Sequence, residues 1–393
     1  MSEVFNPEKF CGLEEYGTSL PGIGGKVKEK TEDFRVEEIP VEMEEGGKFL
    51  LCKLKKKNLT TFEAINKVSS ELGISKNRIG YAGLKDKKAI TTQFVTIRGV
   101  DLEQTKVKKE NIELEPVKKV QKPLRSGDLK GNRFDIVIRD IDLDSEEGRD
   151  RLESLCSGIK EGIPNYYGMQ RFGGDRPITH LVGMEALKGN FKKSVNTYLF
   201  ETFETEKEEF RRARQRLSEE KNYSEALEYF PRSLNHERHL LEKIDDLNPS
   251  SSEGWKEVFK SFPRSLRRLF IHAYQSYIFN VSVSEALRSK DSLSNFPAKV
   301  PGYKTSLSSS VFDKKIRETL EDDGLKLQDF QFEDLNELSS EGTIRAALMK
   351  PEVEIKEISG NEKSGQLSVE LSFSLKPGRY ATVVLREITK NSI

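Results

Sequence analysis

The sequence predicts an α+β protein in which a helix-rich domain is inserted into a strand-rich one. Strand patterns fill the first part of the chain and return after Pro351, whereas the segment from Thr179 to Met349 is patterned mainly for helices. A domain inserted into another is the simplest arrangement that explains this order. A chain of 393 residues is long enough for two such units, each with a core of its own. The expected segments are residues 1–172 and 351–393 for the outer domain and residues 173–350 for the insertion.

Composition and charge leave the function open. Charged residues make up 33% of the chain, and 65 basic residues balance 65 acidic ones, so the net charge neither supports nor opposes a nucleic-acid partner. Three scattered cysteines without a Cys-x-x-Cys pair suit a reducing cytoplasm and argue against disulfides and structural zinc. His236 and His239 have a spacing that can bind metal, but no cysteine stands near them, so we expect no metal. Without a signal peptide or a long apolar run, the protein is expected in the cytoplasm, with no membrane partner.

The first elements lead up to a dense motif. Phe34 and Val36 alternate with polar residues and predict a short strand, and the run Phe49–Leu54 predicts its neighbour. A helix follows, which Thr60 or Thr61 can cap. Its apolar stripe comprises Phe62, Ile65, Val68 and Leu72, and Gly73 can end it.

The dense motif runs from Arg78 to Ile97 and contains one carboxylate, Asp86, among lysines. Gly80 and Gly83 allow a tight turn before Asp86, and the strand pattern resumes after it. A carboxylate on a loop between ordered elements has the placement of many catalytic residues. The surrounding positive charge of Lys85, Lys87 and Lys88 favours the ionised carboxylate and could hold a polyanion. The same residues also fit a solvated charged turn.

A second dense motif follows a strand and a helix. Phe134, Ile136 and Ile138 alternate with polar residues and predict the strand, and residues 146–159 have an amphipathic helical pattern. The motif Gly162–Arg176 then combines glycines, aromatic residues and arginines. Aromatic rings on loops can stack on bases, and arginines can hold phosphates, although a packed aromatic turn has the same composition.

The rest of the chain is patterned for helices and then for strands. Helices are expected over Leu181–Phe203, Glu206–Lys221 and Ser265–Asn280. Leu367–Leu375 alternates apolar and polar residues without exception and predicts a strand. After a Pro-Gly turn, Tyr380–Arg386 is expected to form the last strand.

Taken together, the motifs resemble the TruD family of tRNA pseudouridine synthases, of archaeal type. They occur in the family's order and span nearly the whole chain. They are Lys28 with Phe34 and Val36, the Tyr-Ala-Gly-Leu-Lys-Asp86 loop through Gln93, Leu124-Arg-x-Gly-x-Leu-x-Gly-Asn132, Pro164-Asn-Tyr-Tyr-Gly-x-Gln-Arg-Phe-Gly173, His272-Ala-Tyr-Gln-Ser276 with Phe279-Asn280, and Tyr380-Ala-Thr382 with Leu385-Arg-Glu387.

This resemblance implies a fold, a reaction and a partner. The fold is a pseudouridine-synthase catalytic domain, a mostly antiparallel sheet with flanking helices, interrupted by a helix-rich TruD-type insertion. The enzyme is an isomerase that converts a uridine of tRNA to pseudouridine, at position thirteen in the family's usual substrate. The resemblance implies no cofactor and no metal, tRNA as the partner, and we expect a monomer.

The resemblance also assigns roles to individual residues. Asp86 corresponds to the catalytic carboxylate, and it could attack the base, attack the sugar or remove a ribose proton. Lys28 matches the residue that pairs with it. Tyr167 matches the aromatic residue that stacks on the target base, where the family often has Phe, and Asn165 matches a position that supports the loop or the uracil edge. Further candidates, for substrate contact or loop bracing, are Gln93, Asn132, Arg171 and Arg386. From their charge, the basic residues expected to bind tRNA are Lys85, Lys87, Lys88, Arg125, Lys130 and Arg171.

Two other functions fit parts of the sequence. An RNA-binding or RNA-chaperone protein could keep the fold without catalysis, but it would be expected to lack Asp86 or Lys28, and both are present. A nucleotide-handling enzyme of another fold would need a phosphate-binding loop such as Gly-x4-Gly-Lys-Ser, and the sequence contains none.

Overall fold

The computed structural model describes residues 5–102, 105–289, 297–360 and 366–391, which divide into two compact units. We call residues 17–163 and 350–393 the strand-rich unit, and residues 1–16 and 164–349 the helix-rich unit. The sequence patterns place the domain boundaries after residues 172 and 350, whereas the boundaries between the two compact units fall after residues 16, 163 and 349.

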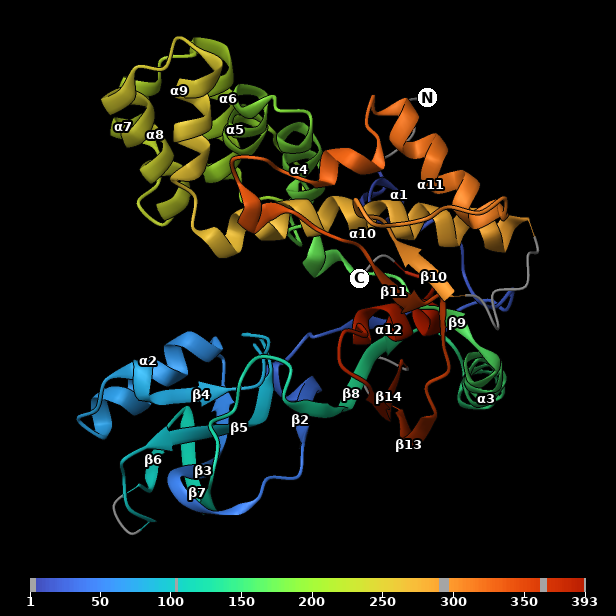
Figure 1. Cartoon of the computed structure of the whole chain (residues 1–393). Helices are drawn as coiled ribbons and strands as arrows, with labels where there is room; N and C mark the ends of the chain where they lie inside the picture. Colours follow the sequence, from blue (N-terminus) through green and yellow to red (C-terminus); the bar gives the residue numbers. More distant parts are fainter. Residues whose placement is uncertain (1–4, 103–104, 290–296, 361–365, 392–393) are drawn as a thin grey trace. The chain divides into compact units, whose positions relative to one another are not determined.

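The strand-rich unit is built on a ten-stranded sheet (Figure 1). The sheet has the order β13-β14-β8-β2-β5-β3-β7-β6, with β1 beside β8 and β4 beside β5. Of its described strand pairs, β2 and β5 alone are parallel, so the predicted α+β class with a mostly antiparallel sheet is confirmed. Its elements are β1 (Lys26–Val27), β2 (Phe34–Pro40), β3 (Glu45–Lys57), α2 (Thr61–Glu71), β4 (Ile79–Tyr81), β5 (Ile90–Arg98), β6 (Val107–Lys109), β7 (Ile112–Val120), β8 (Leu129–Ile141), α3 (Ser145–Glu161), β13 (Val353–Gly360), β14 (Leu367–Leu375) and α12 (Ala381–Thr389).

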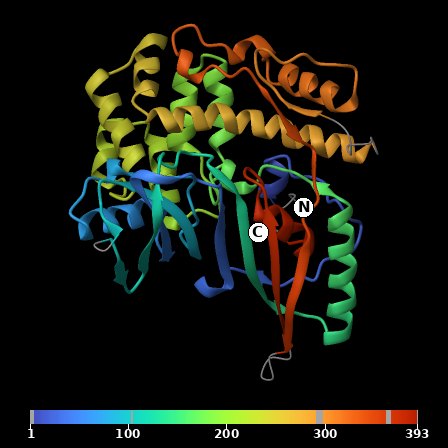
Figure 2. The same cartoon turned by 60° about the horizontal axis from the view of Figure 1, so that its bottom comes forward.

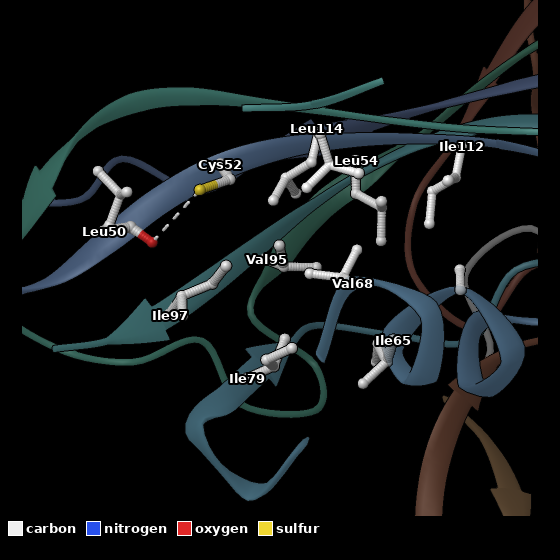
Figure 3. Close-up of a cluster of buried hydrophobic side chains, with 12 residues drawn as sticks. Leu50, Cys52, Leu54, Ile65, Val68, Ile79, Val95, Ile97, Ile112 and Leu114 are labelled. Carbon is white, nitrogen blue, oxygen red and sulfur yellow. Dashed lines mark hydrogen bonds between the residues drawn. The ribbon is translucent and has the colours of Figure 1, made fainter. Parts of the chain in front are cut away.

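Helix α2 packs on the sheet through an apolar cluster (Figure 3). Val68 lies next to Val95 of β5, and Ile65 and Ile97 belong to the same cluster of buried side chains. The helix begins as expected, because Thr60 accepts a hydrogen bond from the Glu63 N–H while the Glu63 carboxylate accepts one from the Thr60 N–H. Phe62 was expected in the buried stripe but is 57% exposed. The buried face of α2 is formed by Thr61, Ala64, Ile65 and Val68, and Phe62, one residue after Thr61, lies on the flank of the helix beside this face.

The other end of the sheet is formed by β8, β14 and β13. Phe134 of β8 stacks on Phe373 of β14 across the antiparallel pair. Helix α3 runs alongside β13 (Figure 2), and α12 packs against α3. The predicted last strand at Tyr380–Arg386 is wrong, because this segment begins α12. Over the whole helix the buried apolar residues Ala381, Val384, Leu385 and Ile388 stand at helical spacing, but the seven residues Tyr380–Arg386 end before Ile388 and show too little of this period to distinguish helix from strand.

The helix-rich unit contains the long helix α10, which crosses α4 and also contacts α11. The predicted helix Leu181–Phe203 is two helices, because Gly189 has a positive φ of 73° between them. No helix of the described ranges is long and apolar enough to cross a membrane. The elements are α1 (Pro7–Phe10), α4 (Thr179–Leu187), α5 (Phe191–Phe200), α6 (Glu208–Glu220), α7 (Tyr223–Tyr229), α8 (Asn235–Leu247), α9 (Ser252–Lys260), α10 (Arg264–Arg288), β10 (Pro297–Val300), α11 (Val311–Asp322), β11 (Thr343–Ala346) and β12 (Leu348–Met349), with β9 (Ile163–Pro164) at the unit boundary.

Candidate active site

Asp86 lies on the loop that joins the antiparallel strands β4 and β5, and buried hydrogen bonds shape this loop. Gln93 of β5 is fully buried, and its Nε2 donates to the carbonyl oxygen of Gly83 at 3.1 Å. Thr61, at the start of α2, accepts from the Lys85 N–H at 2.9 Å and donates to Gln93 Oε1 at 3.1 Å. A helix and a central strand therefore hold the backbone on the N-terminal side of Asp86. In this structure, Gln93 braces the loop and is not exposed to a substrate.

Lys28 and Asp86, 58 residues apart in sequence, form the predicted ion pair. Lys28 Nζ lies 2.8 Å from Asp86 Oδ2, and the two side chains are 24% and 43% exposed. The ammonium also lies 4.0 Å from the centroid of the Phe34 ring, where the ring's negative face attracts it. The backbone of Lys28 has φ 59°, a left-handed conformation that is costly for a residue with a side chain. Backbone strain of this kind concentrates at functional sites.

Lys56 holds the same loop from inside the protein, although no local pattern distinguishes it from the neighbouring lysines. Lys56 is 1% exposed, and its ammonium donates hydrogen bonds to the carbonyl oxygens of Leu59 at 2.6 Å and Asp86 at 2.7 Å. A longer bond of 3.4 Å reaches the carbonyl of Lys85. Burial lowers the pKa of Lys56 from 10.5 to about 8, because the charged form loses its water. The backbone of the catalytic candidate is thus bonded directly to a buried cation.

Two other lysines of the motif, Lys85 and Lys87, pair with glutamates and not with Asp86. The side chain of Lys85 is 5% exposed and pairs at 2.7 Å with Glu38, which is itself buried. This corrects the expectation that Lys85 contacts RNA, because a buried, paired ammonium is not available to a phosphate. Lys87 pairs with Glu63 at 3.0 Å. The pKa of Glu63 is lowered to about 2, first by its backbone hydrogen bond to Thr60 and then by Lys87.

We expect the stability difference between the wild-type protein and a Lys56→Met variant to depend on pH. Between about pH 8 and 10.5 the unfolded chain binds a proton at Lys56 that the folded chain has released. The contribution of this lysine to the free energy of unfolding therefore rises with pH in that window. Below the window, the folded protein carries the full energetic cost of keeping the buried lysine charged. From about pH 7 to about pH 9.5 the wild type should gain roughly 1–2 kcal/mol over the variant. Urea unfolding at both pH values measures the gain, and a difference that stays constant contradicts the buried-lysine assignment.

The second motif of the sequence belongs to the helix-rich unit and centres on Tyr167. Asn280 of α10 is fully buried and clamps the Tyr167 backbone, since its Oδ1 accepts from the Tyr167 N–H at 2.9 Å and its Nδ2 donates to the Tyr167 carbonyl at 3.0 Å. The Tyr167 ring packs edge-on against Phe279 with the ring centroids 5.5 Å apart. The half-buried ring is therefore held in one orientation from two sides.

Arg345 of β11 is the residue of this site that sequence reasoning missed. Its guanidinium lies 4.1 Å from the centroid of the Tyr167 ring, a cation–π contact. It also donates to the carbonyl oxygen of Asn165 at 3.0 Å and to Asn165 Oδ1 at 2.8 Å. Asn165 is 2% exposed, and its Nδ2 donates to the Ala346 carbonyl at 2.8 Å, so its side chain supports the loop. No local motif marks Arg345, because the contact joins positions about 180 residues apart.

The remaining candidates differ in exposure. Lys88, Arg125 and Lys130 are exposed, and Lys130 pairs with Glu42 at 2.8 Å. Arg171 lies in the helix-rich unit, 5.4 Å from the Tyr167 ring centroid. Two candidates lie inside the strand-rich unit. Arg386 is 4% exposed within α12, which favours bracing over substrate contact among its two proposed roles, and the Oδ1 atom of Asn132 in β8 is buried.

Comparison with known proteins identifies the family. The family model described as tRNA pseudouridine synthase D (TruD) matches residues 10–297 and 290–388, which is nearly the whole chain. The chain belongs to the TruD family. It is therefore an isomerase, a tRNA pseudouridine synthase by family, and the resemblance seen in the motifs is confirmed.

TruD relatives match along their full length. A probable tRNA pseudouridine synthase D of Methanococcoides burtonii is 35% identical, covering 99% of this chain and 98% of that protein. One of Methanopyrus kandleri is 34% identical over 93% of this chain and 91% of that protein. The crystal structure of a putative TruD from Methanosarcina mazei superposes with a TM-score of 0.82, at 32% identity over 99% of both chains. This structural match confirms the predicted fold class.

Proposed function

We propose that this TruD protein converts uridine-13 of tRNA to pseudouridine, with Asp86 as the catalytic carboxylate. The observation that carries the proposal is the Lys28–Asp86 ion pair on a loop braced by buried residues. An ion pair that is 24% and 43% exposed is open enough to meet a substrate. The names of the TruD relatives support tRNA as the substrate class.

The reaction rearranges atoms without adding or removing any. The bond between the uracil nitrogen and the ribose breaks, the uracil turns, and its carbon five forms the new bond to the same ribose carbon. The proton on carbon five must then be removed to restore the base, and the ring nitrogen that left the ribose takes up a proton, so the composition is unchanged. An ionised carboxylate can serve as nucleophile or as base in such a sequence without another reagent. Lys28 orients the carboxylate of Asp86 through a charge-assisted hydrogen bond.

We further propose that Tyr167 stacks on the target uracil once the base has left the tRNA stack. A flipped base is commonly held between aromatic or apolar side chains. Asn165 and Arg345 act as positioning residues, since Arg345 contacts both the ring of Tyr167 and the side chain of Asn165. The strand-rich unit would be the catalytic domain and the helix-rich unit the insertion, in a monomeric cytoplasmic enzyme.

The proposal is tested by incubating the purified protein with an unmodified tRNA transcript that carries uridine at position thirteen. Pseudouridine is mapped by carbodiimide treatment and primer extension. We expect one strong stop that reports position thirteen. A transcript with cytidine at that position should give no stop. Modification at another position would contradict the assigned site, and no modification would contradict the assigned activity.

A further inference from the structure

We propose that a basic cavity in the strand-rich unit binds phosphodiester groups of the tRNA substrate. The inference rests on the proposed function and adds a substrate-binding site to it. The cavity has a volume of about 830 Å³ and is lined by residues of β8, β13, β14 and the turn before α12. No residue of the Asp86 loop lines it, so it is a separate site. We call it the β13–β14 cavity, and its cations are Lys130, Arg133, Lys350, Lys356, Lys376 and Arg379.

The strand register explains why cations distant in sequence meet there. Arg133 near the start of β8 pairs with Ser374 near the end of β14. Val353, which begins β13, pairs with Phe373 of the same end of β14. Antiparallel neighbours therefore bring the start of β8, the start of β13 and the end of β14 to one end of the sheet. Lys350 precedes β13 and Lys376 follows β14, so both flank the cavity.

The charge of this cavity departs from that of the whole protein. Six cations and only two carboxylates, Glu352 and Glu354, line it, whereas the chain as a whole has 65 of each sign. Three of the cations are paired, since Lys130 lies 2.8 Å from Glu42, Arg133 lies 3.3 Å from Asp135, and Lys356 lies 2.6 Å from Glu354. In the part of the chain that the structure describes, Lys350, Lys376 and Arg379 have no carboxylate partner. A concave site with excess positive charge attracts a polyanion.

Arg379 gives the cavity its most specific feature. Its side chain is half-buried, and burial lowers its pKa because no described carboxylate compensates for the missing water. An anion in the cavity would supply that compensation. A guanidinium binds a phosphate with two parallel hydrogen bonds, which a lysine cannot do. The cavity is as large as pockets that hold drug-sized ligands, so it can admit a stretch of RNA backbone.

The test neutralises the three unpaired cations together, in a Lys350→Gln, Lys376→Gln, Arg379→Gln triple variant. Binding of a fluorescein-labelled, unmodified tRNA transcript is measured across a series of salt concentrations. Removing one cation that binds a phosphate reduces the slope of log affinity against log salt by about one, so the slope should become shallower by about 2–3. Affinity at about 0.15 M salt should fall about 10-fold or more. The single-turnover isomerisation rate at saturating tRNA should stay near that of the wild type.

Two matched variants isolate the effect of the site. A Lys67→Gln, Lys76→Gln, Lys106→Gln variant removes the same charge from exposed positions outside the cavity and should change the slope by less than half as much. A Lys350→Arg, Lys376→Arg, Arg379→Lys variant keeps the charge and should retain most of the salt dependence. If the neutralised triple variant binds tRNA with the affinity and the salt slope of the wild type, the cavity does not bind the tRNA and the proposal is wrong. Absence of isomerisation by the wild-type protein would instead overturn the proposed function, so the two failures are distinguishable.

Discussion

An Asp86→Asn variant is expected to bind tRNA with an affinity near that of the wild type and to form no pseudouridine. The amide keeps the size of the carboxylate and can still accept a hydrogen bond from Lys28, which lies 2.8 Å from it. It has neither the negative charge of a nucleophile nor the basicity to remove a proton. The loop should stay folded, because Lys56 bonds to the backbone carbonyl of residue 86 and not to its side chain. Single-turnover formation of pseudouridine should fall by at least about 10⁴-fold, a general-base effect at its upper end.

The control for this variant is Asp142→Asn, which removes one exposed carboxylate of the same unit away from the loop. It should isomerise tRNA at the wild-type rate. Turnover by Asp86→Asn within about 10-fold of the wild type would show that another group performs the chemistry. A trace of deamidated or unmutated protein is excluded by mass spectrometry of the same preparation.

The second large effect is expected at Tyr167, where Leu and Phe substitutions should behave differently. A phenyl ring offers the same stacking face as a phenol, so Tyr167→Phe should keep most of the activity. Tyr167→Leu removes the face, and base stacking on an aromatic residue is worth about 1–3 kcal/mol. Its kcat/KM should therefore fall by about 10- to 100-fold. The Leu variant also lacks the cation–π contact with Arg345, whose guanidinium lies 4.1 Å from the ring centroid.

Single-turnover rates of both Tyr167 variants on the same tRNA transcript decide between two roles for this residue. A near-wild-type rate for Tyr167→Phe together with a reduced rate for Tyr167→Leu supports stacking as the only role of the ring. Equal, severe decreases would show that the hydroxyl takes part in proton transfer, which is worth about 10²-fold or more. In that case the stacking assignment is wrong as stated.

The sequence by itself determined the family, the fold class and the position of the Asp86 loop. Each of these features follows from a local sequence pattern that can be recognised without knowing the fold. The glycines before Asp86, the Thr60–Glu63 capping box and the strict alternation in Leu367–Leu375 each specify a turn, a helix start or a strand within a few residues. The pairing of Lys28 with Asp86 was predictable through the family resemblance, although the two residues are 58 positions apart.

Only the tertiary structure decided which charged residues serve the surface and which serve the interior. Lys85 and Lys56 lie in lysine-rich segments like those of the exposed lysines, yet Lys85 is paired with buried Glu38 and Lys56 holds the Asp86 carbonyl. The contact between Arg345 and Asn165 spans 180 residues, and no local pattern encodes it. The segment Tyr380–Arg386 forms a helix because the apolar spacing continues to Ile388, and the seven residues taken alone are too few to show that spacing. Burial and long-range pairing depend on which elements pack together, and this packing is defined only in the folded structure.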